Sequence, residues 1–173
     1  SPYLRGELVR LGLPASKVVV ILNPVFWNEK DAAVVSNEDV GSDRKAKYDV
    51  VYAGRLSEEK GIYELAAAAD LVPETKFVVA GDGPERPFVE KAAARLKNLT
   101  FLGPVSHEGV LDLISNSKIA ALPSICNETL STFALEVFYL GKRCVVPALD
   151  STSWLASGNF PGHLARAGDP QDL

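Results

Sequence analysis

Short runs of β-branched residues alternate with longer helical stretches along most of this sequence, and this alternation limits the fold more than any other feature. Strands are predicted at 48–53, 76–80, 99–102, 118–122, 143–146 and, as a short sixth, 163–167. Helices are predicted near 58–71, 85–97, 107–116 and 129–140. Because the strand runs are apolar on both faces, they favour a mostly parallel sheet covered by helices on both sides. The sequence therefore predicts a doubly wound, Rossmann-like α/β fold that binds its ligand at the carboxyl ends of the strands.

Two further elements are expected before this pattern begins. Leu4, Leu8 and Leu11 share one face of a helix that Gly12 can close. The run 17–22 (KVVVIL) predicts another strand, whereas residues 28–47 are polar without a clear period and predict a loop.

Length and composition exclude several classes of protein. The chain has 173 residues, enough for one domain with a core, and its 47% hydrophobic and 23% charged residues are typical of globular proteins. A net charge of -4 argues against a nucleic-acid-binding surface, and the lack of an apolar run of about 18 residues argues against a membrane span. With no secretory leader in view, we expect a cytoplasmic protein whose Cys126 and Cys144 are reduced, structural thiols.

The chain opens without an initiator methionine and ends where Asp169 and Pro170 predict the start of a helix. We therefore expect a piece of a longer protein.

One buried carboxylate is the first candidate for function. Residues 129–141 predict a helix with apolar side chains almost all round, in which Glu136 is the only charge. A buried carboxylate needs partners, so Glu136 is a candidate binding residue. Glu128 lies eight residues earlier at the expected helix N-terminus, a separation of about 12 Å along a helix. The alternative is that Glu136 pairs with a core arginine and that Asn127 or Glu128 merely caps the helix.

The same helix start offers a place for an anion. The first-turn amides of Leu130, Ser131 and Thr132 would have no helical acceptor, which suits a diphosphate.

A second candidate segment follows the strand that ends at Ala53. Ser57 predicts a helix start, so Lys60 would be a cation at the positive end of a helix. A bound phosphate would explain both Arg55 and Lys60. The alternative is a pair of solvated cations beside the neighbouring glutamates.

Other chemistry finds less support. The run Gly81-Asp82-Gly83-Pro84 begins like a dinucleotide-binding fingerprint, but Arg86 replaces the third glycine, and a tight turn with Pro84 at the first helical position explains it equally well. His107 and His163 have no ligand-spaced partners, so no metal site is expected, and His107 is interpreted as a surface partner of Glu108. Ser124 lacks the context of a catalytic nucleophile.

Taken together, these segments resemble the C-terminal, nucleotide-sugar-binding domain of retaining GT-B glycosyltransferases. The marks are Gly54-Arg55-Leu56 with Lys60-Gly61, Gly81-Asp82-Gly83-Pro84, Phe101-Leu102-Gly103, Pro123-Ser124 followed by Glu128 and Glu136, and Gly168-Asp169-Pro170. Residues 19–24 (VVILNP) match the point where that domain leaves its hinge. The resemblance implies that residues 1–173 are the donor-binding half of a GT-B fold. An N-terminal acceptor domain and the final C-terminal helices would then lie outside this chain.

The resemblance also assigns roles to residues. Arg55 and Lys60 would bind the donor diphosphate and stabilise charge on the leaving nucleotide, and Glu128 would hold hydroxyls of the sugar; these three are the expected catalytic residues. The donor-binding residues would be Gly54, Val105 beside the base, Ser131 and Thr132 at the phosphates, and Glu136 at the ribose.

The implied reaction moves a hexose from UDP-sugar or GDP-sugar to an unknown acceptor with retention, without metal or further cofactor. The implied partners are the nucleotide-sugar and the N-terminal domain, through which peripheral contact with a membrane is conceivable; nucleic acid is not expected. Two alternatives stay open, namely a nucleotide-sugar 2-epimerase of the same fold and a non-catalytic binding module. Thr129 and Ser131 stand where the family often has glycine, and residues 150–154 replace its Gly-Gly stretch.

Overall fold

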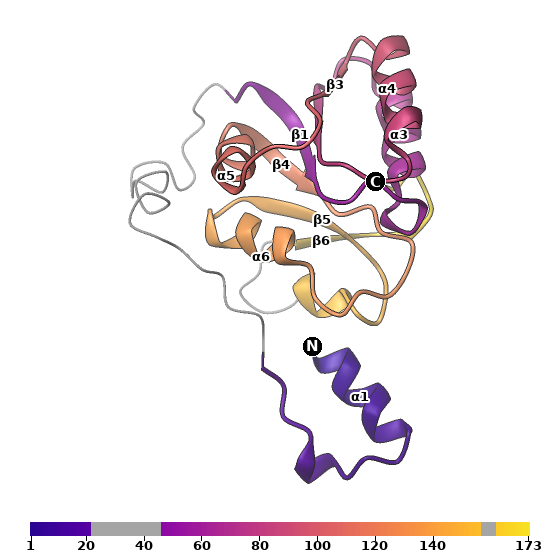
Figure 1. The fold of residues 1–173 in the computed structure, drawn as a ribbon, viewed down its shortest axis with the longest axis vertical. Helices are drawn as coiled ribbons and strands as arrows, with labels where there is room; N and C mark the ends of the chain where they lie inside the picture. Colours follow the sequence, from indigo (N-terminus) through magenta and orange to yellow (C-terminus); the bar gives the residue numbers. More distant parts are fainter. Residues whose placement is uncertain (22–45, 157–161) are drawn as a thin grey trace.

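The computed structural model describes residues 1–21, 46–156 and 162–173, and its centre is one parallel sheet (Figure 1). The strand order is β3-β2-β1-β4-β5-β6, and every neighbouring pair is parallel. The strands are β1 (Tyr48–Ala53), β2 (Phe77–Ala80), β3 (Leu99–Phe101), β4 (Ser117–Ala121), β5 (Arg143–Pro147) and β6 (Gly162–Ala165). The chain builds outward from β1 to β3, returns to β4, and builds outward again. This confirms the predicted doubly wound fold and places its switch point between β1 and β4.

Helices cover the two faces of the sheet in two pairs (Figure 1). The helices are α1 (Pro2–Arg10), α3 (Ile62–Leu71), α4 (Arg86–Arg95), α5 (His107–Ser115) and α6 (Thr132–Tyr139), with short 3-10 helices η1 (Ala15–Lys17), η2 (Glu58–Lys60) and η3 (Ser153–Ala156). On one face, α3 and α4 pack on Val50 and Tyr52 of β1; on the other, α5 and α6 pack on Val51 and Ala53. The alternation along β1 divides the core into two layers, as strand geometry requires.

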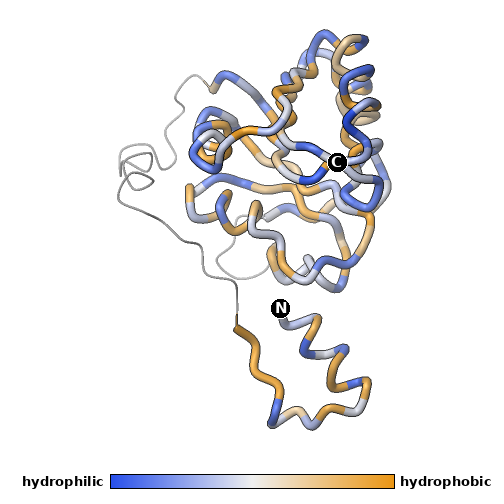
Figure 2. The backbone as a smooth tube through the Cα atoms, in the orientation of Figure 1, coloured by the Kyte–Doolittle hydropathy of each residue, from blue (hydrophilic) through white to orange (hydrophobic). Residues whose placement is uncertain are grey.

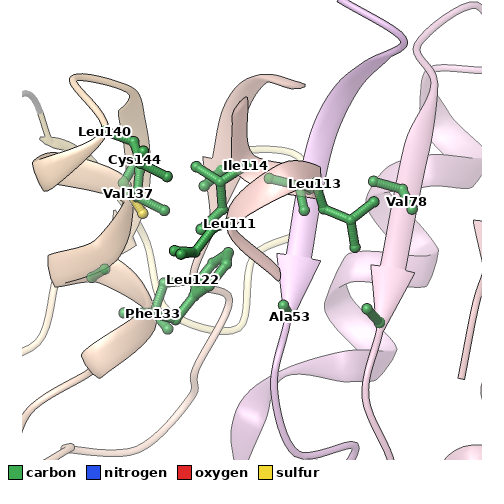
Figure 3. Packing of buried hydrophobic residues seen from close by; sticks show 14 of the residues in the cluster. Ala53, Val78, Leu111, Leu113, Ile114, Leu122, Phe133, Val137, Leu140 and Cys144 are labelled. Atoms are coloured by element: carbon green, nitrogen blue, oxygen red, sulfur yellow. The ribbon is translucent and has the colours of Figure 1, made fainter. Parts of the chain in front are cut away.

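The layer beneath α5 and α6 fixes the relative position of these two helices. Figure 3 shows Leu111 and Ile114 of α5 directed toward Phe133 and Val137 of α6. Val137 and Leu111 are fully buried, and Phe133 is 8% exposed. Burial of side chains of this size contributes about 1.5–3 kcal/mol each. The same layer of buried side chains therefore holds both helices in place.

Most predicted strands and helices are confirmed within a few residues, but the prediction of a strand at 17–22 is wrong over the described residues 17–21. Lys17 ends η1, and the hydrophobic segment that follows lies apart from the sheet (Figure 2). Val19 and Ile21 are 78% and 83% exposed. A β-branched run becomes a strand only beside a partner, and the described sheet places none next to it. Residue 22 and most of the predicted loop 28–47 lie outside the described residues.

Three local predictions need correction. The predicted helix 58–71 is split into η2 and α3 at Gly61, whose left-handed φ of 69° interrupts the helix. Pro84 does not open a helix, because α4 begins at Arg86. The predicted helix start at Asp169 is a turn, in which the Asp169 carboxylate accepts a hydrogen bond from the Gln171 amide at 3.0 Å.

A cavity of about 400 Å³ lies between α3, the sheet and the C-terminal turn. Its wall is largely apolar and includes Leu71, Phe77, Ile119, Val145 and Leu173. None of the candidate site residues lines it. The apolar face at this end of α3 is thus separate from the carboxyl edge of the sheet.

Asp49 ties β1 to both neighbouring strands and generates a prediction about stability. Its carboxylate accepts a hydrogen bond from the Lys76 amide at 2.8 Å and pairs with the Lys118 ammonium at 2.6 Å. The hydrogen bond from Lys118, followed by that from Lys76, holds the pKa of Asp49 below its ordinary value. A carboxylate whose pKa is lower in the folded state stabilises the fold at any pH above its unfolded-state pKa, which is about 3.9 for aspartate. This stabilisation is lost as the pH falls through the folded-state pKa.

We expect Asp49→Asn to lower the free energy of unfolding by about 0.5–1.5 kcal/mol at pH 7, and the difference from wild type to shrink below about pH 4. Urea titrations across pH measure this. Asp70→Asn is the control, because its pair with Arg95 is exposed and should contribute less than about 1 kcal/mol. A difference for Asp49→Asn that is constant with pH would contradict the account.

Candidate functional site

The loops that follow the strands meet at the carboxyl edge of the sheet. The loop after β1 contacts the loop after β2, since the Leu56 amide donates to the Asp82 carbonyl at 2.9 Å. The loop after β2 contacts the loop after β3, since the Gly81 amide donates to the Gly103 carbonyl at 2.8 Å. A Cβ on Gly81 would lie 1.8 Å from the Gly54 carbonyl oxygen, so the glycine permits this close packing.

Gly61 brings the loop after β1 against the loop after β4. Its φ of 69° is left-handed, and a Cβ built on it would lie 1.8 Å from the carbonyl oxygen of Pro123. Beside this contact, the Ile125 amide donates to the Glu59 carbonyl at 3.1 Å. The chain therefore crosses the switch point of the sheet with two loops in direct backbone contact.

This contact places Lys60 beside Glu128, two of the three residues expected to be catalytic. The Lys60 ammonium lies 3.0 Å from Oε2 of Glu128, and the Glu128 side chain is only 8% exposed. The other carboxylate oxygen, Oε1, accepts a hydrogen bond from the hydroxyl of Ser124, which is fully buried. Both oxygens of Glu128 thus have a partner, although a carboxylate can accept further hydrogen bonds at each oxygen.

The loop after β5 fixes the backbone of Glu128. Its amide donates to the hydroxyl of Ser151 at 2.9 Å, and the Ser151 amide donates to Oδ1 of Asn127 at 3.2 Å. Asn127 and Glu128 therefore anchor this loop and do not cap α6, so the capping alternative is wrong. Ser151 belongs to the segment 150–154 that departs from the family pattern.

Arg55 is exposed at the end of β1, and its backbone is held from the core. The hydroxyl of Tyr52, which is 2% exposed, donates to the Arg55 carbonyl at 2.7 Å. Burial, and secondarily the carboxylates of Glu128 and Glu59, raise the pKa of Tyr52 well above its usual range. Tyr52 therefore stays a hydrogen-bond donor at any physiological pH.

The carboxylate of Glu59 lies near the side chains of Arg55 and Lys60. A hydrogen bond from Ser57, 2.7 Å long, is the main cause that holds the pKa of Glu59 below its ordinary value, with smaller contributions from Arg55 and Lys60. Ser57 thus uses its hydroxyl on Glu59 and not as a helix cap. In the described part of the chain, no ion pair joins Arg55 to Glu128 or Glu136.

Helix α6 begins later than predicted. Ser131 is its N-cap and its hydroxyl accepts a hydrogen bond from the Ala134 amide at 3.3 Å, so α6 starts at Thr132. Residues 128–131 are not helical, and the estimate of 12 Å between the two glutamates does not apply. The amide of exposed Thr132 is in the first turn, whereas Leu130 and Ser131 precede it.

Glu136 has a partner that the sequence reasoning missed. Its Oε1 lies 3.0 Å from Nε2 of His107, the first residue of α5. The alternative that Glu136 pairs with a core arginine is therefore wrong, and so is the interpretation of His107 as a partner of Glu108 alone. Val105, predicted to lie near the base, is 36% exposed two residues before His107.

Four supporting residues, Tyr52, Ser124, Ser151 and His107, were not assigned to the site from sequence. Tyr52 and Ser124 lie only three and four residues before their partners Arg55 and Glu128. Ser151 and His107 come from other strand ends, so only the fold brings them to Glu128 and Glu136. Ser124 alone carried a signal, because it follows Pro123 directly at the end of β4 and precedes Glu128 by four residues. Gly54, Arg55, Glu128 and Val105 lie on the loops of the carboxyl edge, where the ligand site is predicted, and Lys60 ends the 3-10 helix η2 that follows β1.

Other kinds of site find no support in the part of the chain that the structure describes. No group of three His, Cys, Asp or Glu side chains is placed to hold a metal ion among residues 1–21, 46–156 and 162–173. None of the helices in these ranges is long and apolar enough to cross a membrane. Cys126 and Cys144 are both free thiols, and burial raises the pKa of Cys144 to about 12.

Comparison with solved structures identifies the fold class. HepE from Anabaena in complex with UDP and glucose superposes with a TM-score of 0.75 at 23% identity, covering 98% of this chain and 48% of that one. Sucrose-phosphate synthase from Thermosynechococcus elongatus gives 0.73 at 22% identity, covering all of this chain and 45% of that one. The chain has the fold of one half of a GT-B glycosyltransferase.

Sequence comparison identifies the family. The model of the glycosyl transferases group 1 matches residues 47–173, and the chain belongs to this family. Alpha-D-kanosaminyltransferase of Streptomyces kanamyceticus is 42% identical in an alignment of 120 residues that covers 65% of this chain and 31% of that protein. Alpha-galactosylglucosyldiacylglycerol synthase of Streptococcus pneumoniae is 29% identical over 96% of this chain and 47% of that protein. The chain thus spans less than half the length of either relative.

The close approach at Gly61 can be tested against a matched glycine. Gly103 has nearly the same φ, 70°, but a Cβ there would meet nothing within 4 Å. Gly103→Ala should cost only the left-handed strain, about 1–2 kcal/mol. Gly61→Ala should cost about 1–3 kcal/mol more, because the loops after β1 and β4 must separate. Urea unfolding of both variants measures the difference, and equal costs would show that the contact with Pro123 is unimportant.

Proposed function

We propose that this chain binds the nucleoside diphosphate sugar donor of a hexosyltransferase that acts with retention. The observation that carries the proposal is the cluster at the switch point, where Lys60, Glu128 and Ser124 converge beside exposed Arg55. Cations suit the diphosphate, and a buried carboxylate suits sugar hydroxyls. The second end of the site, Val105 with Glu136, supplies a place for base and ribose.

The ion pair of Lys60 and Glu128 gives these residues a joint role. Lys60 would contact the diphosphate and Glu128 the sugar, so their ion pair would lie next to the bond between sugar and diphosphate that breaks during transfer. A cation placed there stabilises the charge that develops on the leaving nucleotide. Arg55, held through its carbonyl by Tyr52, would bind the same diphosphate from the end of β1.

The comparisons support transfer chemistry more than epimerisation or simple binding. The two curated relatives reported above are named as a transferase and a synthase, and HepE was solved with UDP and glucose. We further propose that the donor is a UDP-hexose or a GDP-hexose and that transfer proceeds without a metal ion. An N-terminal domain would hold the acceptor in a cytoplasmic protein, and peripheral contact with a membrane would go through that domain.

The two glutamates can be separated by their effects on ligands. Glu136→Gln should weaken binding of a nucleoside diphosphate and of its sugar conjugate by similar factors, because both contain the ribose. Glu128→Gln should not weaken nucleoside diphosphate binding, and can strengthen it because Lys60 loses a competing carboxylate. The sugar conjugate should bind more weakly relative to the nucleoside diphosphate than it does to wild type. The measurement is calorimetric titration with UDP, GDP and a panel of their hexose conjugates. If Glu128→Gln leaves the ratio of the two affinities at the wild-type value, Glu128 does not hold the sugar.

If Arg55 and Lys60 bind the diphosphate, their removal should weaken binding of a nucleoside diphosphate more than binding of the free nucleoside. Arg55→Ala and Lys60→Ala should each weaken nucleoside diphosphate binding by about 1.5–3 kcal/mol, the scale of a hydrogen bond to a charged group. Binding of the free nucleoside should change little. Lys91→Ala, on α4 and outside the site, serves as the control. Equal losses for nucleoside and nucleoside diphosphate would mean that Arg55 and Lys60 act on the fold and not on phosphate.

A further inference from the structure

The contact between His107 and Glu136 has no role in the proposed function as stated so far. It nevertheless links the segment of Val105, the proposed neighbour of the base, to Glu136, the proposed ligand of the ribose. His107 opens α5 just after Val105, and Glu136 lies in the middle of α6. Nε2 of His107 is 3.0 Å from Oε1 of Glu136. The histidine side chain is 48% exposed and the glutamate side chain 15% exposed, so the pair lies at the wall of the site and not in the core.

The fold holds both partners of this pair in place. Ser106 caps α5 by accepting the Gly109 amide at 3.1 Å, which fixes the turn that carries His107. Leu111 and Phe133 pack in the same core cluster beneath α5 and α6. Neither helix can rotate without disturbing that core, so the approach of imidazole to carboxylate is built into the packing of the two helices.

The chemistry of the pair suits positioning. A glutamate side chain has three rotatable bonds, and fixing it on binding costs affinity. A ring N–H on Nε2 of His107 donates to Oε1, which selects one arrangement of the carboxylate. Oε2 then stays available to accept hydrogen bonds from a vicinal diol such as that of ribose.

We propose that His107 is a positioning residue that orients the Glu136 carboxylate toward the ribose of the donor. The inference rests on the proposed function, since it takes Glu136 as the ribose ligand. His107 itself need not touch the nucleotide. Its contribution is the preorganisation of Glu136, which a ligand without ribose hydroxyls cannot use.

The test compares ribonucleotides with deoxyribonucleotides. Wild type, His107→Ala, His107→Gln and Glu136→Gln are titrated with UDP, GDP and their 2′-deoxy counterparts. His107→Ala should weaken binding of the ribonucleotide that wild type binds by about 3- to 10-fold, the scale of one hydrogen bond. Binding of the 2′-deoxy counterpart should weaken less, so the preference for ribose falls.

Two variants distinguish positioning from mere stability. The amide of His107→Gln keeps an N–H donor and should restore part of the preference for ribose. The double variant His107→Ala/Glu136→Gln should show no greater loss of that preference than Glu136→Gln alone, because His107 acts only through Glu136. His163→Ala, at the exposed start of β6, is the matched control and should bind like wild type.

Each outcome decides the matter. An equal loss of ribonucleotide and deoxyribonucleotide affinity in His107→Ala would overturn the proposal and leave a structural ion pair. If Glu136→Gln lowers the preference for ribose while His107→Ala and His107→Gln leave it intact, positioning by His107 is wrong and the proposed function stands. If wild type binds neither UDP nor GDP, the proposed function fails and this inference fails with it. Should His107→Ala not fold, His107→Gln and His107→Phe are compared in the same way.

Discussion

The close contact between Gly61 and the carbonyl of Pro123 is the constraint on which the site depends. In a doubly wound sheet the chain leaves β1 and β4 in opposite directions, so a crevice opens between their carboxyl ends. Only a residue without a Cβ lets the two loops touch there, because a Cβ on residue 61 would lie 1.8 Å from the carbonyl oxygen of Pro123. Lys60 precedes this contact and Ser124 follows it, and both reach Glu128.

The site is electrostatically balanced before any ligand arrives. Lys60 is paired with Glu128, and Glu59 lies beside Arg55 and Lys60. A diphosphate would therefore compete with carboxylates for the same cations, and its own charge would have to offset that competition. The same arrangement fixes the orientation of the Glu128 carboxylate, which a residue that accepts hydrogen bonds from sugar hydroxyls requires.

The fold could be predicted from the sequence because its signals are local. Runs such as 48–53 and 76–80 are apolar on both faces, and helical stretches separate them, which determines a parallel sheet with few alternatives. Failures arose where tertiary partners decide the outcome. Residues 17–21 have the composition of a strand but no neighbouring strand in the described sheet. Gly61 has a left-handed φ of 69° within the predicted helix 58–71, at the point where its backbone meets Pro123.

The site could be predicted only in part, for a related reason. Arg55, Lys60 and Glu128 were recognisable because charged residues follow apolar strands, and Glu136 because it interrupts an apolar helix. Ser151 and His107 were not recognisable as partners, since only the fold brings them near Glu128 and Glu136. Tyr52 and Ser124 lie close in sequence to Arg55 and Glu128, but only Ser124 carried a signal. The predicted start of α6 at residue 129 is also wrong, because Ser131 caps the helix and α6 begins at Thr132.

The most direct test of the account is to locate nucleotide binding on the chain itself. In an amide chemical-shift titration of the labelled protein with UDP and with GDP, one of the two should perturb residues 54–61, 103–107 and 128–136 together, with saturation at a single affinity. The amides around the apolar cavity, such as Leu71, Thr75 and Gln171, should stay unchanged. Perturbation centred on that cavity, or none with either nucleotide, would contradict the claim that the carboxyl edge of the sheet binds the donor.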